Sequence, residues 1–188
     1  MTTQRQGKLP SSHNLNNSNH PRLLRTGHNA DGLSVFLDDQ AVEPFRPFGP
    51  QGSAFFNFDL RESVPVNNTQ SANDIRAALS NNKIPRTPPG GVSFGVTEIA
   101  PNFSVPMHRT LSIDYAVVLS GEIICELDGG QEKAIAVGEF VIQQGTNHRW
   151  HNRRQEPCRI LFVMVSAEPI VLSDGRVLDE TVIQVKRE

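Results

Sequence analysis

Short apolar segments recur along this chain and are separated by glycine, proline, asparagine and aspartate. The segments are residues 34–37, 54–60, 92–100, 105–110, 115–119, 122–127, 134–137, 140–143, 148–152 and 159–166. A series of strand-length segments separated by turn residues is typical of a β-sandwich or β-barrel. A length of 188 residues suits one sizeable domain, and no internal repeat indicates a second barrel. We therefore predict an all-β protein built on a single barrel.

The residues between the segments support strand pairing. Asp128-Gly129-Gly130 joins two strand-like segments and Ser173-Asp174-Gly175 joins two more, as in hairpin turns. One short helix is expected before the main series of strands. Ser71 would be its N-cap, and Asn81-Asn82 followed by Pro85 would end it.

The N-terminal end differs from the rest in composition. Residues 1–21 are rich in Ser, Asn and Gln and hold few large apolar side chains. Such a segment cannot bury enough surface to offset the entropy lost on ordering. We predict three parts: a flexible N-terminal arm over residues 1–21, a barrel domain over 22–168, and a C-terminal hairpin and tail over 169–188.

Charge and cysteine content exclude several classes of function. A formal net charge of −2 gives no electrostatic attraction toward nucleic acid or an anionic membrane. No apolar run approaches the ~20 residues of a membrane helix. Cys125 and Cys158 both lie in strand-like segments, so we expect buried, reduced thiols rather than a disulfide. A cytoplasmic location follows as the expectation.

Two stretches of the chain hold the residues that carry chemistry. His108 and Thr110 are two residues apart, so they face the same side of an extended strand. Asp114 follows after a short turn and can return to that side on the next strand. The later stretch has a turn at Gly145 and then His148 at the start of another strand. We expect these side chains to share one interior.

The first stretch resembles the first motif of the cupin superfamily, which runs G-x5-H-x-H, three or four further residues, and then E-x6-G. His108 and Gly121 match it. The departures are Asn102 at the first glycine, Thr110 at the second histidine and Asp114 at the glutamate.

The second stretch resembles the second cupin motif, G-x5-P-x-G-x2-H-x3-N. The matching residues are Gly138, Gly145, His148 and Asn152. Gln143 replaces the proline, and the interval after Gly138 is one residue short. The chain is also similar to a group of small microbial and fungal cupins that share an M-H-R-T-x-S-x-D-Y stretch. The resemblance covers residues 22–168 and implies a single double-stranded β-helix, or jelly-roll, barrel.

In cupins, histidines and a carboxylate converge on a divalent metal ion inside the barrel. The resemblance therefore implies a metal site made by His108, Asp114 and His148, with Thr110 in place of a fourth ligand. Two imidazoles and a carboxylate suit Fe(II), Zn or Mn without selecting one, and they resemble the facial triad of non-haem iron sites. The alternative is a barrel without metal, in which the two histidines are hydrogen-bonded pocket residues.

Three further residues are candidates for ligand binding. Trp150 lies two residues after His148 and so shares its side, although packing alone would also explain a buried Trp. Asn152 belongs to the second motif, and Arg159 would anchor a carboxylate if it points inward. The side chains expected to face outward are those of Arg109, Tyr115 and His151.

The leading functional prediction is a metal-dependent enzyme that acts on a small organic acid or an aromatic, polyketide-like metabolite. The metal would act as a Lewis acid or as an O₂-binding centre, so the candidate reactions are decarboxylation or other lyase chemistry and oxygenation. An apolar interior suits a ring better than a sugar, and its predicted members are Phe94, Val96, Val118, Phe140 and Phe162. The alternative is a non-catalytic barrel that binds a small ligand with or without metal.

Single-domain cupins commonly pair, so the resemblance also implies a homodimer. The aromatic segment 54–60 and the C-terminal hairpin 169–178 are the candidate contact regions. The arm is too short and too weakly basic for a helix-turn-helix, so no nucleic-acid partner is expected.

Overall fold

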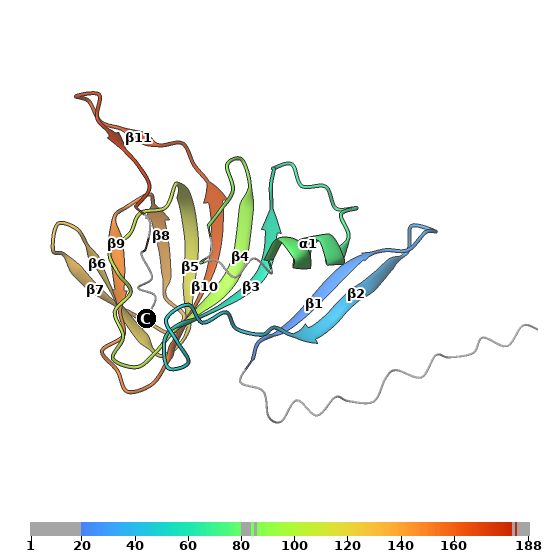
Figure 1. Ribbon diagram of the computed structural model, residues 1–188, viewed down its shortest axis with the longest axis horizontal. Coiled ribbons are helices and arrows are strands. Elements are labelled where there is room, and N and C mark those ends of the chain that lie inside the picture. Colours follow the sequence, from blue (N-terminus) through green and yellow to red (C-terminus); the bar gives the residue numbers. More distant parts are fainter. Residues whose placement is uncertain (1–19, 80–83, 85, 182, 184–188) are drawn as a thin grey trace, which may run out of the picture.

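The computed structural model describes residues 20–79, 84, 86–181 and 183, and these residues form mostly β-strands (Figure 1). The strands are β1 (Arg22–His28), β2 (Ser34–Ala41), β3 (Ala54–Arg61), β4 (Val92–Ile99), β5 (Ser112–Ser120), β6 (Glu122–Leu127), β7 (Glu132–Ala136), β8 (Phe140–Gln144), β9 (His148–His151), β10 (Cys158–Ser166), β11 (Ile170–Val171) and β12 (Val177–Leu178). The one helix of the described residues is α1 (Ala72–Leu79). The predicted arm lies outside these residues except for its last two positions.

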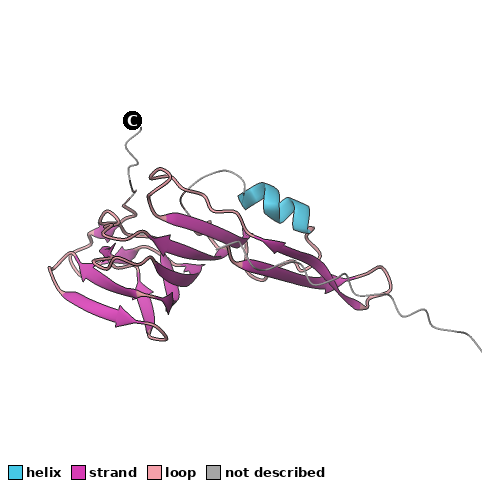
Figure 2. Cartoon of the chain, turned by 90° about the horizontal axis from the view of Figure 1, so that it is seen from below, coloured by secondary structure: helices cyan, strands magenta, loops and turns pink. Residues whose placement is uncertain are grey.

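Two antiparallel sheets form the barrel (Figure 1). A five-stranded sheet has the order β3-β4-β10-β5-β8, and a three-stranded sheet has the order β7-β6-β9. Strands far apart in the chain, such as β4 and β10, are neighbours in the larger sheet. The prediction of an all-β barrel with one short helix is confirmed. Figure 2 shows that the helix lies outside the strands, beside the end of the sheet.

The main core lies between the two sheets. Ile99, Val118 and Ile160 come from the larger sheet, and Ile123 comes from the smaller one. Each is at most 2% exposed, and burying such a side chain contributes about 1.5–3 kcal/mol. The free thiols of Cys125 and Cys158 are buried in the same core, and burial raises the pKa of each to about 11.

Local signals in the sequence account for the turns and the helix. The hydroxyl of Ser71 accepts a hydrogen bond from the Asp74 amide at 3.1 Å, as the predicted N-cap should. The Asp128–Gly130 turn joins β6 to β7, and Gly130 has a φ of 80°. The predicted helix end at Asn81-Asn82 lies outside the described residues.

Two strand predictions were incomplete. Residues 105–110 were expected to form a strand, but the structure gives this segment only isolated bridges, such as the one between His108 and His148. Conversely, β1 was not predicted, because its sequence carries only two adjacent leucines as an apolar signal. β1 pairs with β2 in a hairpin that extends beside the barrel (Figure 1).

The candidate dimer regions differ in exposure. The aromatic side chains of β3 belong to the chain's own interior, since Phe55, Phe56 and Phe58 are at most 7% exposed. They are not available as a contact surface. In the C-terminal hairpin, by contrast, Val171 and Val177 are exposed. The homodimer itself stays a prediction. Among the described residues, no helix has both the length and the apolar character required to span a membrane.

The turn between β5 and β6 generates a stability prediction. Gly121 has a φ of 76°, and a Cβ there would lie 2.9 Å from the carbonyl oxygen of Pro157. We expect Gly121→Ala to lower the free energy of unfolding by about 2–4 kcal/mol, because backbone strain and overpacking add. Gly130→Ala is the matched control, since its φ is similar but no atom lies within 4 Å. It should cost only about 1 kcal/mol. Equal losses in urea unfolding would contradict this account of the turn.

Candidate metal and ligand site

A pair of backbone hydrogen bonds brings the two predicted histidines together. The His108 amide donates to the His148 carbonyl at 2.8 Å, and the His148 amide donates back at 2.9 Å. His148 begins β9, whereas His108 lies in the irregular segment before β5. The imidazole ring centroids are consequently 4.3 Å apart. Both side chains are buried, and both line the same cavity.

The backbone also selects the tautomer of each ring. Nδ1 of His108 lies 2.8 Å from the carbonyl oxygen of Pro106, and Nδ1 of His148 lies 2.9 Å from that of Thr146. Because a carbonyl only accepts, Nδ1 carries the proton in both rings. Nε2 is therefore the unprotonated nitrogen, which is the form that binds a metal ion.

Burial keeps these imidazoles neutral. It lowers the pKa of His108 to about 4. It lowers that of His148 to about 3, with a further contribution from His108. At neutral pH, neither ring has to lose a proton before it binds a cation. The pair thus fits a divalent transition ion by its chemistry.

Asp114 reaches the same interior from β5. Its Oδ1 accepts a hydrogen bond of 2.5 Å from the Ser112 hydroxyl, which also lies 2.9 Å from the hydroxyl of Thr110. Burial raises the pKa of Asp114 to about 6 despite the hydrogen bond from Ser112. The predicted set of His108, Thr110, Asp114 and His148 therefore shares one cavity.

The Asp114 carboxylate nevertheless does not lie close to both imidazole rings. Three metal-ligating side chains are close enough to share an ion when their ligand atoms all lie within 4.8 Å of one another. Among the residues that the structure describes, His108, Asp114 and His148 do not meet this criterion. An aspartate is one methylene shorter than the usual cupin glutamate, and Ser112 holds its oxygen. The two histidines form the close pair, and Asp114 lies farther away.

The cavity has a volume of about 270 Å³ and a largely apolar wall. Trp150 lines it, edge-on to His148 with ring centroids 5.7 Å apart. Phe94, Val96 and Phe162 also line it, as predicted. Val118 packs in the core instead, and Phe140 is wrong as an interior residue because it is 79% exposed.

Gln143 is a cavity residue that the sequence analysis did not assign to the site. It lies on β8 opposite Asp114, is 5% exposed, and lines the cavity. Its Oε1 is buried and has no hydrogen-bond partner in the part of the chain that the structure describes. A buried amide oxygen without a partner is costly, so it favours a donor such as a ligand hydroxyl or a metal-bound water. The signal was present in the sequence, because Gln143 stands where the cupin motif has proline.

Two predicted ligand-binding residues do not reach the cavity. Asn152 is buried, but its amide donates to the carbonyls of Ile99 and Glu156 and thereby ties loops together. Arg159 pairs with Glu98, its cross-strand neighbour on β4, at 2.8 Å and lies 5.7 Å from the centroid of the Phe56 ring. The cross-strand carboxylate therefore holds Arg159 away from the interior.

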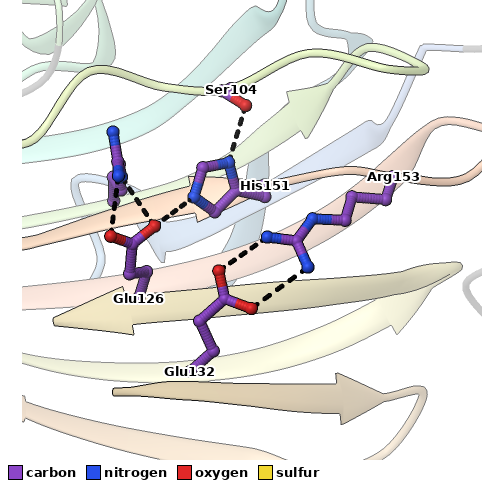
Figure 3. A network of polar contacts seen from close by, with 6 residues as sticks. Ser104, Glu126, Glu132, His151 and Arg153 are labelled. Atoms are coloured by element: carbon purple, nitrogen blue, oxygen red, sulfur yellow. Dashed lines mark hydrogen bonds and ion pairs between the residues drawn. The ribbon is translucent and has the colours of Figure 1, made fainter. Parts of the chain in front are cut away.

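A second His–Glu group lies on the smaller sheet (Figure 3). Ligand atoms of Glu126, Glu132 and His151 lie within 4.8 Å of one another. However, Arg149 binds both oxygens of Glu126, and Arg153 binds both oxygens of Glu132. His151 links Glu126 to the Ser104 hydroxyl at 2.6 Å on each side. These partners satisfy the carboxylates, so the group is a surface ion-pair network.

A short antiparallel barrel with two neutral histidines in an apolar interior defines the class of protein. The cupin domain family matches residues 95–164. Phomopsin biosynthesis cluster protein C′ of Diaporthe leptostromiformis is 34% identical over 161 residues, which cover 84% of each chain. The cupin-domain-containing oxidoreductase virC of Hypocrea virens is 32% identical over 157 residues, covering 79% of this chain and 77% of virC. The chain belongs to the cupin superfamily.

Among solved structures, the chain is similar to recombinant oxalate oxidase in complex with glycolate. It is 16% identical, with a TM-score of 0.44, and the match covers 66% of this chain and 56% of the oxidase.

The buried titratable groups predict how stability depends on pH in the metal-free protein. The folded pKa values of His108 and His148 lie below the ordinary value of 6.5. The unfolded chain therefore binds more protons below pH 6.5, and the free energy of unfolding should fall as pH falls toward 4. Asp114 opposes this trend, because its raised pKa stabilises the folded state as pH falls from about 6 to 3.8.

Urea unfolding of chelator-treated protein between pH 7 and pH 4 measures these contributions. His148→Gln should flatten the pH dependence by up to about 1.4 kcal/mol per pH unit, the most that one group contributes. Asp114→Asn should steepen it. If both variants show the pH dependence of the wild-type protein, the pKa shifts of His148 and Asp114 do not determine how stability changes with pH.

Proposed function

We propose that this cupin is a metal-dependent oxidoreductase that acts on a small, largely apolar metabolite inside the barrel. The observation that carries the proposal is the pair His108 and His148. Two neutral imidazoles, each with Nδ1 turned to a backbone carbonyl, lie side by side in a buried apolar cavity. The relatives in Hypocrea virens and Diaporthe leptostromiformis support it, since they are described as an oxidoreductase and a biosynthesis cluster protein.

His108 and His148 would hold the ion through Nε2, and the carboxylate of Asp114 would complete the set, through a water where it does not reach. A bound divalent ion would supply Lewis acidity or a redox centre next to the substrate. Fe(II), Mn and Zn all suit this donor set.

The other cavity residues have separate roles in this proposal. Before the ion binds, Asp114, with a pKa of about 6, can hold a proton at its carboxyl group, and ligation of the ion would displace that proton. Ser112 keeps that group oriented. Gln143 offers its unpartnered oxygen to a hydroxyl of the substrate or to a water. Trp150 and Phe162 exclude bulk water and provide a face for a ring.

Metal content tests the site directly. We expect purified protein to contain about one transition ion per chain. His108→Ala should lower the affinity for that ion by at least about 10–100-fold, because one of two imidazole ligands is lost. Elemental analysis after dialysis is the measurement, and circular dichroism confirms that the variant is folded.

His151→Ala is the matched control, since it removes a histidine from the outer network and leaves the cavity unchanged. It should retain the ion. Loss of metal in His151→Ala together with retention in His108→Ala would move the site to the outer network. Folded wild-type protein that takes up no metal but still binds a small ligand would favour the non-catalytic alternative.

Oxygen uptake tests the reaction class. With small aromatic acids and hydroxylated aromatics as test substrates, we expect metal-loaded protein to consume O₂ and His108→Ala to show less than about 1% of that rate. An oxygen electrode and product analysis make the measurement. Product formation at full rate without O₂ would instead indicate lyase chemistry.

A further inference from the structure

The guanidinium of Arg86 contributes a positive charge to the wall of the cavity. Among the described residues that line it, Arg86 is the only arginine or lysine. Arg86 lies in the connection between α1 and β4 and is 27% exposed, so its side chain is reachable from solvent as well as from the interior. Burial is the largest influence on the pKa of His108, Asp114 and His148, and the Arg86 charge lowers all three. The positive charge of Arg86 therefore acts on His108, Asp114 and His148.

The carboxylate that faces Arg86 comes from the C-terminal segment. Nε of Arg86 donates to Oε1 of Glu180 at 2.6 Å across 94 residues of sequence. The Glu180 side chain is 34% exposed. The chain around Glu180 is anchored beside the metal-site histidine, because the Thr181 amide donates to the carbonyl of Arg109 at 3.1 Å. Ile183, a few residues on, is buried in the cavity wall.

Two carboxylates among the described residues line the cavity, and both have partners other than Arg86. Asp59 is paired with Arg25 at 2.9 Å and with Arg61 at 2.8 Å. Asp114 accepts its hydrogen bond from Ser112. The pair between Arg86 and Glu180 thus joins the one arginine or lysine among the described wall residues to a carboxylate that is 34% exposed. A ligand carboxylate entering from solvent meets the same guanidinium.

We propose that Arg86 anchors the carboxylate of a small aromatic or aliphatic acid, which replaces Glu180 as its partner while the apolar part of the acid fills the cavity. This assignment rests on the proposed function for the position of the site and names its substrate class. A guanidinium forms two parallel hydrogen bonds to a carboxylate, which favours acids over neutral isosteres. Glu180 then acts as an internal competitor that keeps the charge paired until an acid binds.

Binding of an acid and its amide tests the assignment. The probes are 3-phenylpropanoate and 3-phenylpropanamide, which share a ring and chain length and differ in charge. Isothermal titration calorimetry gives the affinities, and the fluorescence of Trp150, the only tryptophan of the chain and a cavity residue, reports occupancy. Each titration is carried out on chelator-treated protein and on protein loaded with Mn²⁺.

We expect wild-type protein to prefer the acid. Arg86→Gln should weaken acid binding by about 10–100-fold and change amide binding by less than about threefold, in both preparations. Arg86→Lys should lie between them, because it keeps the charge and loses the fork. Glu180→Gln should strengthen acid binding by about 3–10-fold, since a neutral amide competes less well. The exposed pair of Arg176 and Asp174, at 2.7 Å, supplies matched controls, and Arg176→Gln and Asp174→Asn should change neither affinity.

The outcomes separate this proposal from the metal site. A preference for the acid that survives in Arg86→Gln overturns the anchor; if it also requires Mn²⁺, the ion binds the carboxylate and the proposed function stands. An Arg86-dependent preference in protein that takes up no Mn²⁺ when the ion is supplied supports the anchor while the proposed function fails. Weaker acid binding in Glu180→Gln, with a lowered melting temperature, would make the pair a structural pin and overturn the exchange. Absence of binding by either probe overturns the substrate class.

Discussion

The reciprocal backbone hydrogen bonds between His108 and His148 are the contact on which the site depends. His108 lies outside any regular strand, so these two bonds attach its segment to the start of β9. The same contact sets the distance between the imidazole rings, and the carbonyls of Pro106 and Thr146 set their orientation. Geometry and tautomer therefore come from main-chain groups. Backbone hydrogen bonds hold the two imidazoles at a defined spacing more rigidly than side-chain contacts alone would.

Burial then decides the charge state of what the backbone has positioned. The apolar wall makes charge on either imidazole costly, so both stay neutral, and the same wall raises the pKa of Asp114 toward neutrality. At neutral pH both imidazoles are therefore uncharged, and the pKa of the Asp114 carboxyl group lies about one unit below the pH. The neutral histidines need lose no proton to accept a cation, whereas a cation bound at Asp114 would displace the proton of its carboxyl group. Burial behind the apolar wall thus sets the acid–base properties of all three side chains.

Residue spacing was sufficient to predict the barrel and the members of the cavity that belong to regular alternation. His148 and Trp150 share a face because they are two apart on β9, and His108 and Thr110 share one although their segment is not a strand. Residue spacing did not predict the direction of a side chain where an ion pair with a distant residue determines it. Arg159 lies next to an irregularity in the pairing of β10 with β5, and its ion pair with Glu98 comes from β4. Arg86 and Glu180 meet across 94 residues from loop positions, so no local pattern contained that contact.

Strand β8 shows why such failures carry information. Its alternation is the reverse of what hydrophobicity predicts: Gln143 faces the cavity, while Phe140 and Ile142 are 79% and 64% exposed. A sequence selected only for stability would place the apolar residues inside. The inward amide would suit a polar ligand opposite Asp114, since its Oε1 has no partner among the described residues. The outward Phe140 and Ile142 lie on the edge strand of the larger sheet, next to the exposed Tyr115. Exposed apolar side chains on an unpaired edge favour contact with another chain. The homodimer stays a prediction, and the exposed side chains of β8 are more accessible for such a contact than the buried aromatic side chains of β3.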